Sequence, residues 1–329
     1  MSENLLQVKN LKTYFFTDGG VVKSVDDVSF NVKPGKTLGV VGESGCGKSI
    51  TSLSIMQLVE TPPGKIVDGE IIYNGENLLD KDKDEMRKIR GGEIAMIFQE
   101  PMTSLNPVFT VGQQIMEALM IHTDMDKTKA KERAIEMLKL VRIPLAEKRF
   151  NEYPHQLSGG MRQRVMIAMA LSCNPKLLIC DEPTTALDVT IQAQIMDLLK
   201  ELQLKEGKSI ILITHNMGLV AEMADEVCVM YMGRVVECGS LEDLFDRTSH
   251  PYTRALLRSV PVLGLADGQK LETIPGATPN PADLKGGCEF ADRCSECMDR
   301  CREKTIPMFE IAPGHRVRCL KFDSYPEVD

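Results

Sequence analysis

A glycine-rich segment over residues 42–49 has the spacing of a phosphate-binding loop. It reads Gly-Glu-Ser-Gly-Cys-Gly-Lys-Ser. Glycines let backbone N–H groups surround phosphate oxygens, and a following helix adds the positive end of its dipole. We expect Lys48 to reach the β- and γ-phosphates and Ser49 to place its hydroxyl on Mg²⁺. The residues predicted to contact the nucleotide here are Gly42, Ser44, Gly45, Cys46, Gly47, Lys48, Ser49 and Ile50.

A pair of carboxylates ends the apolar run 177–180. Asp181 can hold Mg²⁺ directly or through water, and Glu182 is suited to act as general base for an attacking water. Acidic residues often end strands, so the pair alone is ambiguous. Together with the phosphate loop it predicts hydrolysis of a nucleoside triphosphate.

The elements around the phosphate loop follow from short alternating runs. Residues 5–73 alternate apolar and polar positions between turns, which predicts strands. Residues 37–41 form an apolar run that leads directly into the loop, and residues 48–58 predict a helix. Strand, loop and helix in this order are the context that a phosphate loop requires.

The rest of the chain changes character several times. Residues 101–171 predict helices, with Ala134, Leu138 and Val141 on one face. The charge-dense segment 81–90 is interpreted as a solvated surface. Further elements are predicted as buried strands at 177–180 and 210–213, a helix at 190–204, a hairpin at 227–237 and short helices at 241–245 and 252–257.

Composition limits the class of protein. The 329 residues include 39 basic and 47 acidic side chains, a net charge of −8, which argues against a general nucleic-acid binder. No run reaches the roughly 20 apolar residues that span a bilayer. The first residues show no secretion signal, so we expect a cytosolic chain that can still sit against a membrane through a partner.

Five of the ten cysteines lie close together near the C-terminus. In a reducing compartment, thiols at such spacing are more often metal ligands than disulfides. Zinc typically takes two Cys-x-x-Cys pairs, and only Cys294 and Cys297 have that spacing. Thiolates from one irregular loop suit an iron–sulfur cluster at least as well. Zinc and a metal-free tail remain alternatives.

The motifs over residues 5–240 resemble those of the nucleotide-binding subunit of an ABC transporter. Besides the loop and the carboxylates, they include a Leu-Ser-Gly-Gly segment at 157–160 and a histidine at 215. The resemblance implies an α/β fold with a P-loop, RecA-like core, an N-terminal antiparallel β subdomain and a helical subdomain near 101–171. A small irregular, cysteine-rich extension is expected to follow. The domain bounds expected are 1–250 and 251–329.

Family roles carry over by position. Phe15 matches the aromatic residue that stacks on adenine, with Tyr14 and Phe16 as neighbouring alternatives. Gln99 matches the glutamine that touches Mg²⁺ or the water, and His215 the histidine that contacts the γ-phosphate.

The resemblance also implies a composite site. Ser158, Gly159 and Gly160 match the signature that contacts ATP bound to a partner subunit, and Asp188 belongs to the segment 186–188 that communicates across the dimer. The chain departs from the usual pattern at Met161, where glutamine is commonest, and at Thr185, where serine is usual. Neither change removes a phosphate contact.

Several further stretches are similar to the ATPases of dipeptide, oligopeptide and nickel importers. They lie at 100–107, 160–164, 188–192 and 250–253. The resemblance implies two transmembrane permease subunits, a second homologous ATPase subunit arranged head to tail, and an extracytoplasmic peptide-binding protein. Peptide import is the function expected, with nickel import as the alternative. A soluble ATPase of this superfamily acting on nucleic acid is the rival from another class.

The same subfamily implies a ligand set for the tail. Its pattern Cys-x5-Cys-x6-Cys with a distant cysteine matches Cys288, Cys294, Cys301 and Cys319 and leaves Cys297 spare. Some relatives with this arrangement carry a [4Fe–4S] cluster. The cofactors expected are therefore ATP, Mg²⁺ and such a cluster, with a structural role for the cluster.

Overall fold

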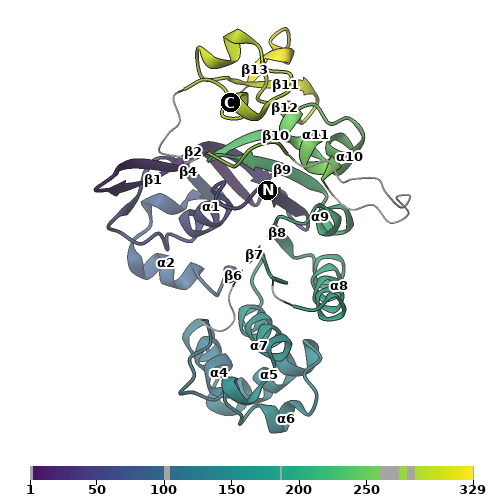
Figure 1. The fold of residues 1–329 in the computed structure, drawn as a ribbon. Coiled ribbons are helices and arrows are strands. Elements are labelled where there is room, and N and C mark those ends of the chain that lie inside the picture. The colour runs from purple at the N-terminus through teal and green to yellow at the C-terminus, as the bar shows by residue number, and fades with distance from the viewer. Residues whose placement is uncertain (1–2, 100–103, 186, 260–273, 280–285, 329) are drawn as a thin grey trace, which may run out of the picture. The chain divides into compact units, whose positions relative to one another are not determined.

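The computed structural model describes residues 3–99, 104–185, 187–259, 274–279 and 286–328 (Figure 1). The chain divides into two units, and each is described by itself. The first unit comprises Met1–Lys33, Thr37–Leu79 and Ile213–Asp329, and the second comprises Pro34–Lys36 and Asp80–Leu212. Residues 100–103 of the expected motif at 100–107 lie outside the described residues, as does Ala186.

An antiparallel sheet occupies the N-terminal part of the first unit. Its strands are hydrogen-bonded in the order β2 (Gly20–Val32), β1 (Leu6–Thr17), β4 (Gly64–Tyr73) and β5 (Glu76–Asn77). Along β1, burial favours alternate side chains because one face of the sheet packs inward. The antiparallel β subdomain expected from the sequence is confirmed.

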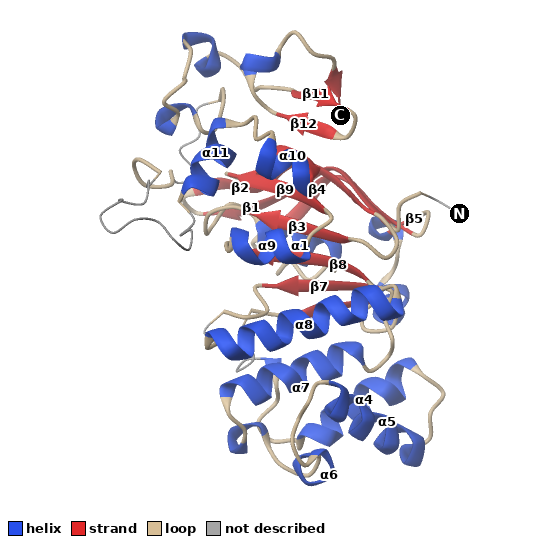
Figure 2. Ribbon diagram, turned by 90° about the vertical axis from the view of Figure 1, so that its right-hand side faces the viewer, coloured by secondary structure: helices blue, strands red, loops and turns tan. Residues whose placement is uncertain are grey.

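A second sheet in the first unit contains the strand that leads into the phosphate loop. Its strands run in the order β13 (Glu327–Val328), β11 (Met308–Ala312), β12 (His315–Val317), β10 (Arg234–Ser240), β9 (Glu226–Tyr231) and β3 (Thr37–Val41). β3 pairs in parallel with β9, and all five of its residues are buried. Helix α9 (Met217–Met223) packs against β3 at Gly39, where an added Cβ would lie 2.9 Å from Val220 Cγ1 (Figure 2).

Helix α1 (Lys48–Ile55) follows the phosphate loop and is shorter than the expected 48–58. Gln57 has a left-handed φ of 48°, and the N–H of Leu58 donates to the carbonyl of Leu53 at 2.8 Å. A left-handed residue with such a back-bond is a common helix end. The chain therefore leaves the helix before Leu58.

The second unit contains a short parallel array of strands. β8 (Ser209–Thr214), β7 (Leu177–Asp181) and β6 (Ile94–Ile97) are hydrogen-bonded in that order, and the last two residues of β8 belong to the first unit. Every residue of β7 and β8 is buried, as expected for strands covered on both faces. Helix α8 (Val189–Glu206) ends at Gly207, whose φ is 65°.

Four further helices of the second unit gather together in Figure 1. They are α4 (Val111–His122), α5 (Lys127–Leu140), α6 (Ala146–Arg149) and α7 (Gly159–Leu171). Side-chain oxygens of Thr110, Asp126 and Ser158 cap α4, α5 and α7. The helical character expected for 101–171 is confirmed for its described part, and Ala134, Leu138 and Val141, which were predicted to share one face, are all buried.

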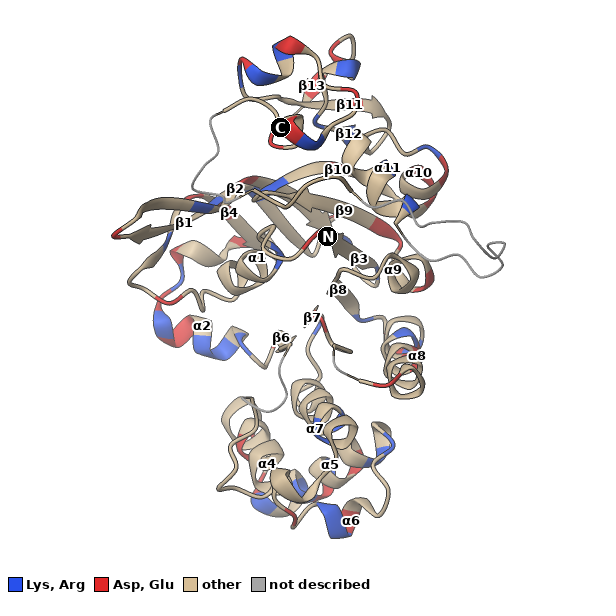
Figure 3. Ribbon diagram, viewed as in Figure 1, with Lys and Arg blue, Asp and Glu red and all other residues tan. Residues whose placement is uncertain are grey.

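One helix of the second unit was not predicted. α2 (Lys83–Ile89) lies in the charge-dense segment 81–90 and begins with a capping box between Asp82 and Glu85. Most of its side chains are exposed, so the interpretation as a solvated surface is confirmed. Figure 3 marks basic and acidic residues interspersed along the ribbons of α2 and α6.

The C-terminal part of the first unit is more regular than expected. Helices α10 (Leu241–Asp246) and α11 (Pro251–Arg258) are followed by 3₁₀ turns η4 (Ala291–Arg293), η5 (Asp299–Arg302) and η6 (Leu320–Phe322). Strand β12 pairs with β10 through Glu237 opposite Val317, which joins the tail to the sheet. In the part of the chain that is described, no helix combines the length and apolar character needed to cross a bilayer.

Candidate functional site

The phosphate loop is shaped by glycines in the left-handed region. Gly42, Gly45 and Gly47 have φ values of 151°, 79° and 102°. A Cβ at Gly42 would lie 2.2 Å from the carbonyl oxygen of Met230, and one at Gly47 would lie 2.3 Å from that of Ser24. Gly45 has open space around it. Backbone conformation and close approach therefore both require glycine at 42 and 47.

The ammonium of Lys48 is buried against its own loop. Nζ donates to the carbonyl oxygens of Gly42 at 2.7 Å and Glu43 at 3.0 Å. Only 5% of Lys48 is exposed. Its positive charge is thus held inside the loop, where phosphate oxygens can take over from the carbonyls as partners.

Cys46 serves the loop as a small buried side chain. Its Sγ fills the space beside Gly42, where an added Cβ would lie 2.7 Å from the sulfur. Burial raises the pKa of the Cys46 thiol, although the Lys48 ammonium acts in the opposite direction. A protonated, buried thiol is a poor nucleophile. This geometry fits a small structural side chain better than a redox role.

The predicted general base stands at a strained position after β7. Glu182 has a left-handed φ of 46°. Its Oε2 accepts hydrogen bonds from Gln99 Nε2 at 3.0 Å and from Thr185 Oγ1 at 2.9 Å. Non-glycine residues in this region persist where the surroundings fix them, often at active sites. The second unit thus brings together two predicted catalytic residues, Gln99 and Glu182, with Asp181 buried at the end of β7.

The signature segment begins helix α7. Ser158 caps the helix by accepting from the N–H of Met161 at 3.4 Å. A Cβ at Gly160 would lie 3.1 Å from Ile191 Cγ2, whereas Gly159 has open space. Gln163 in the same helix donates to the carbonyl of Pro183 at 2.6 Å, directly after Glu182. The signature helix is therefore bonded to the segment that carries the predicted base.

Two residues found in the structure were not assigned a role from the sequence. Thr185 was noted only as a departure from serine, and Gln163 only as part of the stretch 160–164. Because Thr185 follows Glu182 by only three residues, the hydrogen bond between their side chains could have been predicted from the sequence. The Gln163 contact could not, because it depends on how α7 packs.

The remaining predicted residues lie on separate elements. Asp188 caps α8 by accepting from the N–H of Ile191 at 2.9 Å. His215 is exposed between β8 and α9. Phe15 is half-buried on β1, while the hydroxyl of Tyr14 donates to Asp26 at 2.6 Å and 51% of Phe16 is exposed. Since Tyr14 is committed to Asp26, Phe15 and Phe16 remain the candidates for stacking on adenine.

The cysteines of the tail surround one small cavity of the first unit. Cys288, Cys294, Cys297, Cys301 and Cys319 all line a space of about 20 Å³, and none forms a disulfide. Backbone N–H groups two residues further on bond to three of the sulfurs: Phe290 to Cys288, Glu296 to Cys294 and Lys321 to Cys319. Burial nevertheless raises the pKa of these three thiols.

The expected metal centre has a thiol donor set but no assembled ion site. Among the described residues, no group of three or more Cys, His, Asp or Glu is placed to hold a metal ion. A tetrahedral zinc with Zn–S bonds of about 2.3 Å would need its sulfurs within about 4 Å of one another. The described geometry therefore shows neither a site for a single zinc ion nor the expected [4Fe–4S] cluster.

Two protein families match different parts of the chain. Residues 25–185 match the family described as "ABC transporter", and residues 236–301 match "Oligopeptide/dipeptide transporter, C-terminal region". The oligopeptide transport ATP-binding protein AppD of Bacillus subtilis (strain 168) is 54% identical over 321 residues, 97% of each chain. The dipeptide transport ATP-binding protein DppD of Escherichia coli (strain K12) is 49% identical over 315 residues, 96% of each chain.

A solved structure agrees with these matches. The "Dimeric Structure of MJ0796, a Bacterial ABC Transporter Cassette" is similar with a TM-score of 0.65 and 31% sequence identity. It covers 72% of this chain and 98% of its own. The same cassette is also described in a dimeric post-hydrolysis state with ADP and Pi, at the same similarity.

Proposed function

This chain belongs to the ATP-binding proteins of the oligopeptide and dipeptide ABC transporters, and on that basis we propose that it hydrolyses ATP to drive peptide import. The observation that carries the proposal is the environment of Glu182. The backbone of Glu182 has a left-handed φ, and its carboxylate accepts hydrogen bonds from Gln99 and Thr185. A carboxylate held in this way is suited to orient and deprotonate water. The relatives' names support peptides as cargo and do not favour nickel.

Each residue has a proposed task in the reaction. Lys48 and the loop N–H groups bind the phosphates, while Ser49 and Asp181 hold Mg²⁺ with Gln99. Glu182 accepts the proton of the attacking water, and His215 contacts the γ-phosphate. Catalysis of this kind depends on positioning and charge stabilisation. Phe15 is the proposed adenine contact, with Phe16 as its alternative.

We propose that the signature segment 158–160 contacts ATP bound to the second ATPase subunit. Ser158 and Gly160 begin α7, and a helix N-terminus favours the negative charge of a phosphate. In a head-to-tail pair they would face ATP held by the second ATPase subunit, with Asp188 at the junction. The dimeric form of the similar cassette supports this arrangement. The pair would bind two permease subunits at the cytoplasmic face of the membrane.

Reconstitution tests this function directly. The chain is assembled in liposomes with two permease subunits, a second ATPase subunit and a peptide-binding protein of the same transporter. We expect ATP hydrolysis to rise when the binding protein is loaded with peptide, and labelled peptide to accumulate on the opposite side. Stimulation by nickel without peptide, or DNA-dependent ATPase activity of the chain alone, would contradict the proposal.

We also propose that Cys288, Cys294, Cys301 and Cys319 hold a [4Fe–4S] cluster. Five free thiols around one cavity and N–H donors on three sulfurs support it, since such hydrogen bonds stabilise cluster thiolates. When bound, the cluster would supply a structural crosslink within the tail. The chain's own contribution is to present the sulfurs and exclude water.

Anaerobic purification with an absorption spectrum and iron and zinc assays tests the cluster. The wild-type chain and Cys297→Ser are expected to be brown with iron, and Cys294→Ser to lose colour. A colourless wild-type chain with stoichiometric zinc, or with no metal, would contradict this part of the proposal without affecting ATP hydrolysis.

A further inference from the structure

The side chain of Glu43, the second residue of the phosphate loop, is clamped by the C-terminal tail. Arg293 makes two parallel bonds to its carboxylate, Nη1 to Oε2 at 2.6 Å and Nη2 to Oε1 at 3.0 Å. Thr278 Oγ1 adds a third contact to Oε2 at 3.3 Å. Only 6% of the Arg293 side chain and 25% of the Glu43 side chain are exposed. A bidentate, shielded pair of this kind fixes geometry as well as charge.

Both the N–H and the carbonyl of Glu43 form hydrogen bonds. Its N–H donates to the phenol oxygen of Tyr252 at 2.9 Å. Its carbonyl accepts from Lys48 Nζ at 3.0 Å and from the N–H of Cys46 at 3.3 Å. Glu43 is thus the residue through which the tail reaches the part of the loop that surrounds the phosphates.

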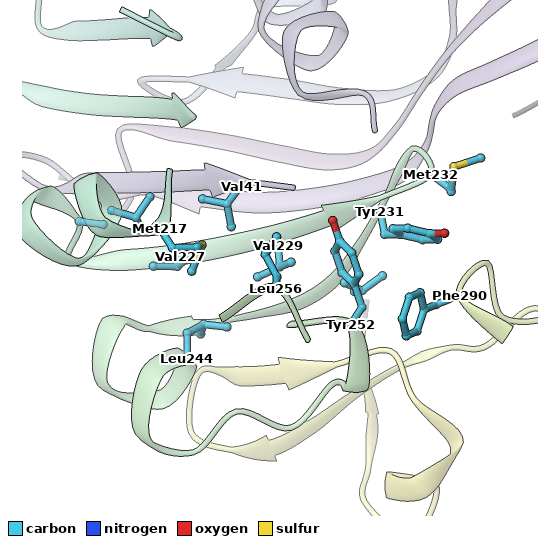
Figure 4. Close-up of a cluster of buried hydrophobic side chains, with 13 residues drawn as sticks. Val41, Met217, Val227, Val229, Tyr231, Met232, Leu244, Tyr252, Leu256 and Phe290 are labelled. Atoms are coloured by element: carbon cyan, nitrogen blue, oxygen red, sulfur yellow. The ribbon is translucent and has the colours of Figure 1, made fainter. Parts of the chain in front are cut away.

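Arg293 is itself rigidly placed. Its Nε donates to the carbonyl of Pro275 at 2.9 Å, and Nη1 donates to the hydroxyl of Tyr231 at 3.2 Å. Its guanidinium lies 5.8 Å and 6.0 Å from the ring centroids of Tyr231 and Phe290. Figure 4 shows Tyr231, Tyr252 and Phe290 grouped in the buried cluster that also contains Val41, next to the loop. An arginine held this way has little freedom to follow a moving carboxylate.

We propose that Arg293 is a positioning residue of the phosphate loop, which neutralises Glu43 and holds the loop in its ATP-binding shape. The inference rests on the proposed ATP hydrolysis but not on a metal in the tail. Without Arg293, an unpaired carboxylate would stand beside the site that receives the phosphates and would repel them. Arg293 directly precedes Cys294, so the cysteine cavity and the phosphate loop share one short segment.

The test measures, by titration calorimetry, the affinity of the purified full-length chain for the non-hydrolysable analogue AMP-PNP in the presence of Mg²⁺. We expect Arg293→Gln to weaken binding about tenfold, because the partner charge stays behind. The double variant Glu43→Gln/Arg293→Gln should recover most of that loss, since the stranded charge is removed as well. Arg247→Gln, which removes an exposed guanidinium that pairs with Glu242 and Asp243, is the matched control and should bind like the wild type.

A second variant tests positioning without changing charge. Tyr252→Phe keeps the ring but removes the acceptor of the Glu43 N–H, and we expect binding about fivefold weaker. Binding by Arg293→Gln within twofold of the wild type would overturn the inference, as would a double variant as weak as the single one. If the wild-type chain bound no nucleotide at all, the proposed ATPase function would fail instead.

Discussion

Gln99 Nε2 donates to Glu182 Oε2 at 3.0 Å, on the same oxygen that accepts from Thr185 Oγ1 at 2.9 Å. Two donors on one carboxylate oxygen orient the proposed base, whose backbone has a left-handed φ of 46°. Thr185, which departs from the usual serine, is therefore a hydrogen-bond partner of the proposed base. A hydroxyl at 185 is what the arrangement requires.

Removing that hydroxyl should lower the rate. Thr185→Ala loses one hydrogen bond to a charged group, about 1.5–3 kcal/mol. We expect kcat to fall by about tenfold or more, with ATP binding little changed because Thr185 does not belong to the phosphate loop. Thr185→Ser keeps the donor and is the control, with kcat expected within about twofold of the wild type. A Ser variant as slow as the Ala variant would assign the effect to the methyl group.

The glycines of the phosphate loop should respond differently to alanine. Gly47→Ala places a Cβ 2.3 Å from a backbone oxygen, so the loop must move. We expect loss of detectable ATP binding. A Cβ at Gly45 meets open space, so Gly45→Ala should destabilise the loop only through the left-handed φ, by about 1 kcal/mol. Titration with AMP-PNP should show Gly45→Ala binding within about tenfold of the wild type, and equal losses in both variants would show that sterics at Gly47 are not decisive.

Gln163 should matter for stability as well as for rate. Its buried amide donates to the carbonyl of Pro183 at 2.6 Å, and only 2% of the residue is exposed. Gln163→Leu leaves that carbonyl without this donor, which costs about 1–3 kcal/mol. We expect a lower midpoint of urea unfolding and a reduced kcat. Gln192→Leu, on the half-buried surface of α8, is the control; an equal loss there would mean that the effect is not specific to Pro183.

Cys46 should be inert in the folded chain. It is 1% exposed, and burial raises the pKa of its thiol. We expect a maleimide reagent to leave Cys46 unlabelled under native conditions and to label it in urea, as peptide mapping by mass spectrometry would show. Rapid native labelling would indicate that the loop opens. Cys46→Ala should bind AMP-PNP within about threefold of the wild type.

Local signals in the sequence predicted much of the site. Glycine spacing identified the phosphate loop, and the apolar run before Asp181 identified the strand that presents Glu182. The capping box from Asp82 to Glu85 was also visible, so helix α2 could have been predicted. The early end of α1 was not visible, because it depends on the conformation of Gln57.

Contacts between distant parts of the chain could not be predicted. Glu43 and Arg293 are 250 residues apart, and nothing in either segment indicates the other. The strands of the tail were missed for a related reason. They are only two to five residues long, and β12 is stabilised by pairing with β10 more than by its own pattern. Tertiary pairing of this kind overrides local propensity.

The central claim is that Glu182 is the base of an ATPase, and Glu182→Gln tests it most directly. The amide oxygen can still accept from Gln99 and Thr185, so the site should keep its shape while losing proton acceptance. ATP turnover and ATP binding are measured side by side on the reconstituted transporter, with Glu201→Gln, an exposed surface change, as the control. We predict a loss of turnover of about 10²-fold or more with ATP binding retained. Turnover within about threefold of the wild type would contradict the account.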